Sequence, residues 1–384
     1  MGKIIKLIQS LHEQNLDSTL INKLYNMLHR KQDLNDDTIN IDNSNIVGEI
    51  TLRTPVYKDY VDYIRTVFIN LVIHVTDYYV RFYDSKAEEL CAQLYGDGIG
   101  VSQNQLAAVT SMNRSDWGPM CQIVDFPEFK YFTGIKIIDT IFTSTSDDTA
   151  NKTLKTIELP NSITHIGREG YGGGFCFTNI ESIIIPNNVT IRAAAFHNCE
   201  KLKHVTLGYG CYIDWQAFQY CPLLENFDLN GATNIGTSAF DGCQSMTSLI
   251  IPNTVTFIGN GPFVNTGITS LTFENENDDN ALTLQGGTNG WRPGTFRAMN
   301  NNIKYIILPK RLTELKDNAL GNTTKINFVF TSTTPPSVTG NGELGYVDES
   351  WLYVPDEAIE AYKAAPGFNT WISRIKPASE FVAY

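Results

Sequence analysis

The middle of the sequence repeats one short pattern at a nearly constant interval. Runs of the form apolar-x-x-apolar-x-apolar begin at residues 154, 180, 202, 224, 246, 268 and 303, and four of the six steps are 22 residues long. A coil of about 22 residues cannot bury its own apolar edge, so it must stack on the next coil. The pattern therefore predicts a solenoid in which equivalent side chains form ladders along the core.

A second set of positions keeps the same interval. Phe196, Phe218, Phe240 and Phe263 are separated by 22, 22 and 23 residues, and an alanine precedes the first three. Three of these phenylalanines are followed three residues later by Cys199, Cys221 and Cys243. We expect the rings to stack in register and the thiols to pack as small buried side chains.

Composition and charge exclude several classes of protein. With 42% hydrophobic residues, the 384-residue chain can build a core, and its net charge of −12 argues against non-specific binding to nucleic acid or to anionic lipid. Neither a secretory signal core nor an apolar stretch long enough to span a bilayer is found. We therefore expect synthesis in the cytoplasm without membrane insertion. The odd number of cysteines, seven, favours reduced thiols, although stacked coils could bring two of them within disulfide distance.

Residues 1–85 lie outside the repeat and form a separate expected module. Apolar stripes predict short helices over residues 1–32, the Asp/Asn-rich stretch 33–45 is expected to be a linker, and alternation predicts a long strand over 66–83. Such short helices need a partner surface, in this chain or in another subunit. We expect this module to anchor the protein or to form a homo-oligomer.

The solenoid itself is expected at 151–330, with a cap on each side. Residues 86–150 are predicted to form the N-terminal cap, in which Ser85 and Ser102 begin capping boxes. Residues 331–384 are predicted to form the C-terminal cap, with a last strand at 351–355 followed by an N-capped helix from Asp356. The predicted fold class is α+β: a small α/β module followed by a β-solenoid with short helical caps.

The repeat unit resembles a known family. Residues 248–259 and 239–243 together resemble the BspA-type leucine-rich repeats of gut and oral bacteria, as do residues 353–367 at the C-terminal cap and 131–135 ahead of the repeats. The resemblance covers residues 90–376 and implies a leucine-rich-repeat solenoid. In relatives the segment at 95–105 often resembles a calcium loop, but here only Asp97 is a carboxylate and Gln105 stands near the closing Glu. We therefore expect no calcium there.

Most members of this family are exported, whereas this chain shows no export signal and carries a different N-terminal module. That architecture resembles bacteriophage virion proteins. It implies location in a virion, with residues 1–85 contacting other virion proteins and the repeats facing a host. The alternative is an adhesin on the bacterial cell surface.

Residues that could support catalysis or bind metal are few. His197, Cys199, His204 and Cys211 lack the paired spacing of a zinc site. The glycines at 172–174 lack the Lys-Ser/Thr continuation of a phosphate loop and are expected to relax a turn in the 26-residue coil. Asp278 and Asp279, in a 13-residue insertion, are expected to be a solvated surface, the alternatives being a metal contact or a glycan-processing enzyme. We expect no enzyme, cofactor or metal.

Binding is the remaining hypothesis. A solenoid offers an extended surface whose variable positions select a partner. Aromatic side chains off the repeat positions suit contact with a host-surface protein or a glycan. The candidate residues are Tyr209, Tyr212, Trp215, Tyr220 and Trp291. The other interpretation is that each of them only covers the edge of a coil.

Overall fold

The computed structural model describes residues 79–98, 100–112, 122–142, 152–225, 227–274, 280–287, 294–299, 303–321, 323, 325–341, 344–345 and 349–383, with the backbone of 39–40 and 49–50. The chain divides into two compact units, residues 1–108 and 109–384. None of the helices in these ranges combines the length and apolar character needed to cross a bilayer. The predicted helices at 1–32 lie outside the described residues, as do Trp291, Asp278 and Asp279.

The N-terminal unit corrects three local predictions. Strand β1 (Ile39–Asn40) pairs antiparallel with β2 (Glu49–Ile50), so the expected linker contains a strand. Only residues 79–83 of the predicted long strand are described, and they are not a strand. Helix α4 (Ser85–Leu94) is capped by Asp84 rather than by Ser85. The carboxylate of Asp84 accepts hydrogen bonds from the backbone amides of Lys86 and Ala87.

A reciprocal capping box begins helix α5 (Gln103–Ala108) as predicted. The amide of Gln105 donates to Ser102 Oγ at 3.2 Å, and the amide of Ser102 donates to Gln105 Oε1 at 2.8 Å. Asp97 accepts from the amide of Gly100 at 3.1 Å and from the hydroxyl of Tyr79. The side chains of Asp97 and Gln105, the two residues compared with a calcium loop above, thus hold local backbone structure.

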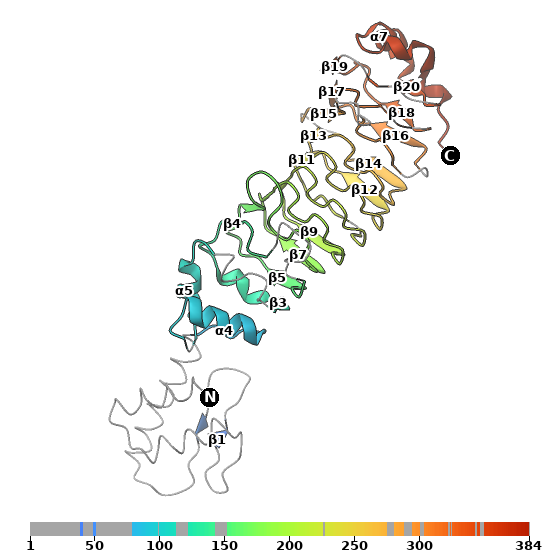
Figure 1. Ribbon diagram of the computed structural model, residues 1–384. Helices are drawn as coiled ribbons and strands as arrows, with labels where there is room; N and C mark the ends of the chain where they lie inside the picture. Colours follow the sequence, from blue (N-terminus) through green and yellow to red (C-terminus); the bar gives the residue numbers. More distant parts are fainter. Residues whose placement is uncertain are drawn as a thin grey trace, which may run out of the picture. The chain divides into compact units, whose positions relative to one another are not determined.

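The second unit is a β-solenoid in which most regular coils contribute two short strands that pair in parallel with those of the next coils (Figure 1). The first strands of successive coils form three sheets, and, among the described residues, a single bridge from Thr206 to Asp228 reaches the one regular coil that lacks a first strand. These strands are β3 (Asp125–Phe126), β5 (Thr156–Glu158), β7 (Ser182–Ile185), β9 (His204–Leu207), β12 (Ser248–Ile251), β14 (Ser270–Phe273), β16 (Tyr305–Leu308), β18 (Asn327–Phe330), β20 (Leu352–Val354) and β21 (Ile375–Pro377).

The second strands form one nine-stranded parallel sheet along the other side of the coils (Figure 1). In order they are β4 (Ile137–Ile138), β6 (His165–Ile166), β8 (Thr190–Ile191), β10 (Tyr212–Ile213), β11 (Asn234–Ile235), β13 (Phe257–Ile258), β15 (Leu282–Gln285), β17 (Leu312–Lys316) and β19 (Ser337–Thr339). The repeat predicted from the sequence is confirmed, because strand pairing joins equivalent residues such as Ile183 and Val205, or Leu249 and Leu271.

The phenylalanine ladder forms the centre of the core. Phe196, Phe218, Phe240 and Phe263 stack with ring centroids 5.0, 5.6 and 6.3 Å apart and interplanar angles below 10°. The stack continues towards the N-terminus. The Phe175 ring lies 5.3 Å from Phe196, and the Phe142 ring lies 5.4 Å from Phe175. These six rings are at most 3% exposed. The predicted ladder is therefore confirmed, and it begins two coils earlier than the sequence indicated.

Each ladder cysteine satisfies a backbone carbonyl of the preceding coil. The thiols of Cys199, Cys221 and Cys243 donate to the carbonyl oxygens of Phe175, Phe196 and Phe218 at 3.1, 3.1 and 3.2 Å. All three cysteines are free and fully buried. Burial raises the pKa of the Cys221 and Cys243 thiols above the ordinary range, which makes their thiolates unfavourable.

Because of this burial, we expect iodoacetamide to leave Cys199, Cys221 and Cys243 unmodified in the folded protein and to alkylate all three in denaturant. Peptide mass spectrometry after a timed pulse measures both states. The alkylation rate of a short unstructured peptide that contains cysteine, measured under the same conditions, provides the reference. Rapid native modification of any of the three thiols would contradict the packing described.

The turn around each phenylalanine uses left-handed backbone conformations. Ala194, Gln216 and Ser238, two residues before the ladder rings, have φ of 57°, 55° and 53°. This region costs non-glycine residues about 1 kcal/mol or more. Their amides donate to carbonyls of the next coil at 2.9–3.0 Å, as do the amides of the ladder phenylalanines at 2.8–2.9 Å. The inter-coil hydrogen bonds offset the backbone strain.

The C-terminal cap contains a strand beyond the predicted last one. The predicted last strand, β20, pairs with a further strand, β21. The predicted helix starts as a 3₁₀ turn at Asp356–Ala358 and continues as α7 (Ile359–Ala364), and Asp356 accepts from the amide of Ser379 instead of capping the helix. Phe381 packs at 5.1 Å against both Tyr305 and Tyr353. The final segment therefore returns to cover the first-strand sheet.

One carboxylate on the nine-stranded sheet gives a pH-dependent contribution to stability. Glu314 in β17 accepts from the hydroxyls of Thr339 at 2.6 Å and Thr283 at 3.0 Å, and these hydrogen bonds, Thr339 first, lower its pKa. A lowered folded-state pKa stabilises the protein above the unfolded-state pKa, and the contribution is lost as pH falls through the folded-state value.

We therefore expect Thr339→Val to raise the pKa of Glu314 and to weaken the dependence of stability on pH in the acid range. Carboxyl carbon chemical shifts measure the first effect, and denaturant unfolding at several pH values measures the second. The Ser337→Ala variant, at the start of the same edge strand, is the control. An unchanged pKa of Glu314 in Thr339→Val would disprove the assignment.

Candidate functional site

One coil carries a loop that the other regular coils lack. Ile166 and Phe175 are nine residues apart, whereas the equivalent Ile191 and Phe196 are five apart. The four extra residues lie in the Gly167–Gly174 connection. Gly173 requires glycine, because it has φ of 87° and an added Cβ would lie 2.7 Å from the Arg168 nitrogen and the Asp139 oxygen. The prediction that these glycines relax a turn in the 26-residue coil is confirmed.

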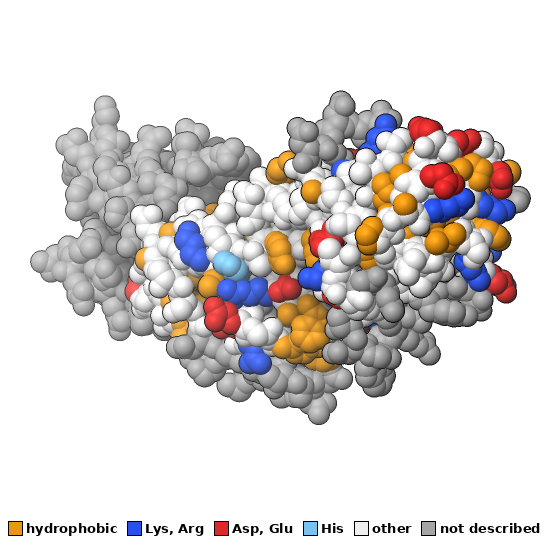
Figure 2. Space-filling model, turned by 90° about the horizontal axis from the view of Figure 1, so that it is seen from above, with side chains coloured by type: hydrophobic (Ala, Val, Ile, Leu, Met, Phe, Trp, Pro, Cys, Tyr) orange, Lys and Arg blue, Asp and Glu red, His pale blue; other side chains and the backbone are white. Residues whose placement is uncertain are grey.

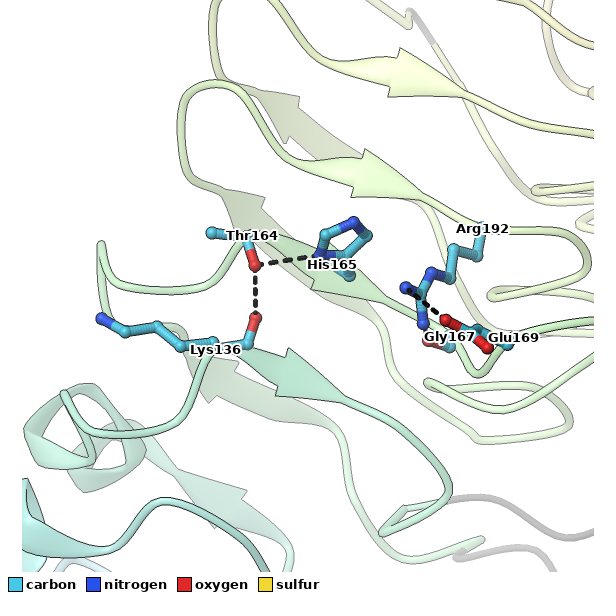
Figure 3. A network of polar contacts seen from close by, with 6 residues as sticks. All are labelled: Lys136, Thr164, His165, Gly167, Glu169 and Arg192. Atoms are coloured by element: carbon cyan, nitrogen blue, oxygen red, sulfur yellow. Dashed lines mark hydrogen bonds and ion pairs between the residues drawn. The ribbon is translucent and has the colours of Figure 1, made fainter.

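Polar contacts hold the base of this loop (Figure 3). Arg192 donates to the carbonyl of Gly167 at 3.3 Å and lies 4.0 Å from the carboxylate of Glu169. Thr164 donates to the carbonyl of Lys136 at 3.0 Å and lies 2.9 Å from Nδ1 of His165. Burial, then the Arg192 charge, lowers the pKa of His165, so this imidazole is neutral at pH 7.

The loop brings Tyr171 against aromatic side chains of the following coils. Its ring centroid lies 5.5 Å from Trp215 and 6.2 Å from His197. His197 in turn lies 5.4 Å from Tyr220 and 5.5 Å from Phe177. The five residues Tyr171, Phe177, His197, Trp215 and Tyr220 are called the aromatic cluster below.

Three rings of the aromatic cluster are open to solvent. Tyr171, Trp215 and Tyr220 are 41%, 44% and 45% exposed. Partial burial nevertheless raises the pKa of Tyr171, so its hydroxyl stays protonated and can donate at neutral pH. The rings therefore offer apolar faces and polar edges together.

A shallow hollow of about 580 Å³ adjoins the cluster at Tyr220. Its remaining lining combines polar and apolar residues from successive coils: Asn198, Glu200, Lys201, Pro222, Leu223, Gly242, Gln244 and Asn265. Gly242 has φ of 81°, and a Cβ there would lie 2.7 Å from the Tyr220 ring. The glycine therefore allows Tyr220 to lie across the next coil.

A second concave surface lies on the first-strand side, over β5, β7 and β9. It encloses about 560 Å³, and its outward-facing lining includes Glu158, Ile184, His204 and Thr206. Ile184 is 66% exposed, and Ile250 further along the same row is 61% exposed. Figure 2 shows a surface on which acidic, basic and hydrophobic side chains are interspersed without an extended field of one charge.

The structure joins only some of the residues singled out by sequence. Trp215 and Tyr220 belong to the aromatic cluster. Tyr212 lies in β10 on the nine-stranded sheet, and Tyr209 covers Gly231, where a Cβ would lie 2.3 Å from its ring. Among the described residues, no ring contact links either tyrosine to the cluster. Tyr171 was missed, although the longer coil with its glycines was a usable signal.

The described cysteine thiols nearby contact backbone carbonyls. In the part of the chain that the structure describes, no three His, Cys, Asp or Glu residues are grouped to hold a metal ion. The thiol of Cys199, once considered a zinc ligand, donates to the Phe175 carbonyl instead. The Cys211 thiol likewise donates to the carbonyl of Pro186 at 3.3 Å.

The stacked coils and in-register ladders define a leucine-rich-repeat solenoid with an exposed aromatic surface. Residues 171–283 match the family model of the BspA type leucine rich repeat region in six copies, so this segment consists of BspA-type repeats. A search of curated proteins finds no match.

Two solved structures show limited similarity. One is a leucine rich cell surface protein from Faecalibacterium prausnitzii, 19% identical, with a TM-score of 0.30, covering 59% of this chain and 62% of that protein. The other is a leucine-rich repeat protein from Bacteroides ovatus, 16% identical, with a TM-score of 0.20, covering 65% and 76%. This chain thus spans less than two thirds of the Faecalibacterium protein.

Proposed function

We propose that this protein is a non-enzymatic binding protein whose solenoid presents the aromatic cluster to a protein or glycan on a host surface. The observation that carries the proposal is the Gly167–Gly174 loop, which adds an exposed Tyr171 to Trp215 and Tyr220. The core does not need these rings, because the phenylalanine ladder already fills it. Exposed aromatic side chains on a rigid support are typical contributors to binding energy.

Adsorption of the labelled protein to intact host cells tests this function. These are bacterial cells of the strain that carries the gene if the carrier is a virion, and cells of the colonised tissue if the carrier is the bacterial surface. We expect the double variant Tyr171→Ala/Trp215→Ala to bind at least about tenfold more weakly than the unchanged protein. The matched control is Tyr209→Ala/Tyr212→Ala, which removes two exposed aromatic rings outside the cluster. Equal losses in both variants, or no adsorption by the unchanged protein, would refute the proposal.

We further propose that residues 1–85 attach the solenoid to a larger assembly, either a bacteriophage virion or the bacterial surface. The support is the separate N-terminal unit, which does not follow the 22-residue repeat. Immunogold labelling of purified particles and protease treatment of intact cells distinguish the two carriers. Label on particles supports the virion, cleavage on cells supports the adhesin, and a signal in neither would contradict both.

A further inference from the structure

From the aromatic cluster and the adjoining hollow together, we infer that this protein has a binding site for an uncharged oligosaccharide, with Tyr220 as the residue common to both parts. The inference rests on the proposed binding function and narrows it to one class of ligand. It depends on ring geometry, on the chemistry of the hollow and on the local charge.

The rings form inclined walls rather than one flat surface. Tyr171 is tilted by 54° to Trp215, and His197 is tilted by 63° to Tyr220. The negative face of an aromatic ring attracts the weakly positive C–H groups of a sugar ring. A saccharide with apolar faces and a rim of hydroxyls can therefore contact two inclined rings at once, while its rim reaches the neighbouring polar groups.

The hollow supplies groups that suit hydroxyl recognition. Amide side chains of Asn198, Gln244 and Asn265 each combine donor and acceptor, as a sugar hydroxyl does. Asn265 donates one amide hydrogen to Asp241 at 3.3 Å, which leaves its oxygen and its second hydrogen for a ligand. Asn198, Tyr220, Gly242 and Asn265 occupy equivalent turn positions in four successive coils. With a strand spacing of about 4.8 Å, they form a row about 14 Å long. This row favours an extended chain of sugar units over a single small molecule.

The local charge argues for a neutral ligand. The hollow contains one acidic residue, Glu200, and one basic residue, Lys201, both exposed. These two charges offset one another, but the buried carboxylate of Asp241 lies against Asn265, and the chain as a whole carries −12. The surroundings of the hollow therefore do not attract an anion. A phosphorylated or acidic polymer would need a basic surface, whereas the hydroxyls of an uncharged sugar need only paired donors and acceptors.

The experiment compares adsorption of the full chain to three samples of the same cells: untreated, periodate-oxidised and trypsin-treated. Periodate cleaves the vicinal diols of glycans, and trypsin removes exposed protein. We expect periodate to abolish adsorption and trypsin to leave it unchanged. We also expect at least one of cellotetraose, maltotetraose, xylotetraose and mannotetraose, whose units carry vicinal diols, to compete.

Three single variants link the ligand to the site: Trp215→Ala, Tyr220→Ala and Gln244→Ala. Each is expected to weaken adsorption and competition by about fivefold or more, whereas Tyr212→Ala leaves both unchanged. Adsorption that survives periodate and is lost after trypsin would overturn the oligosaccharide site and leave the proposed binding function standing. Failure of the unchanged protein to adsorb to untreated cells would overturn the binding function itself.

Discussion

Replacing Phe218 by alanine is expected to lower the free energy of unfolding by about 3–5 kcal/mol. The Phe218 ring is completely buried, stacks at 5.0 Å on Phe196 and 5.6 Å on Phe240, and meets the edge of Phe227 at 5.1 Å. The neighbouring coils are fixed by their own inter-coil hydrogen bonds, so they cannot collapse into the cavity. Denaturant unfolding followed by circular dichroism measures the loss.

The matched control is Ile250→Thr on the outer side of β12. Ile250 is 61% exposed and pairs with Thr272, so the substitution extends a threonine already present in the next coil. Its effect is expected to stay within about 0.5 kcal/mol. If Phe218→Ala were no more destabilising than this control, the continuous phenylalanine core would be wrong.

The second large effect is expected at a buried cation. Arg311 is 5% exposed, and its guanidinium donates to the carbonyls of Val255 at 2.5 Å and Pro252 at 3.0 Å. Its own carbonyl accepts from the amide of Leu282 at 2.8 Å. The backbone of Arg311 therefore binds the adjacent coil, while its side chain reaches one coil further and links three coils.

We expect Arg311→Met to reduce stability by about 2–4 kcal/mol, because two buried carbonyls lose charged donors while the apolar stem is kept. Arg311→Lys should recover only part of this loss, since an ammonium cannot reproduce the fork of the guanidinium. The control is Lys310→Met at the exposed neighbouring position. Equal stability of the Arg311→Met and Lys310→Met variants in urea would contradict the bridging role.

The repeat made the solenoid predictable, because one substitution pattern is sampled many times in a single chain. Phe196, Phe218 and Phe240 could be assigned to one ladder without any structure, since only stacking explains a large apolar residue every 22 positions. The reciprocal contact of Ser102 and Gln105 was equally predictable, since both partners lie within one helical turn.

Features that depend on a single coil were not predictable. The sequence placed 13 extra residues in one coil, but the structure divides them among three connections: four before β15, seven before Phe296 and two before Ile303. Asp84 was overlooked as a cap because Ser85 also matched the pattern. Tyr171 was missed because its contacts with Trp215 and His197 depend on the path of a glycine-rich loop, which periodicity does not specify.

The in-register pairing of successive coils has a consequence for how such a gene can change length. Because each coil contacts its neighbours through equivalent residues, as Ile183 does with Val205, a duplication of about 22 codons would add a coil whose two surfaces match those already there. Unequal recombination within the array therefore preserves the fold. The same event between Tyr171 and Trp215 would separate the rings by a further coil. If these rings bind the proposed ligand, selection would suppress the event there and tolerate it towards the C-terminus.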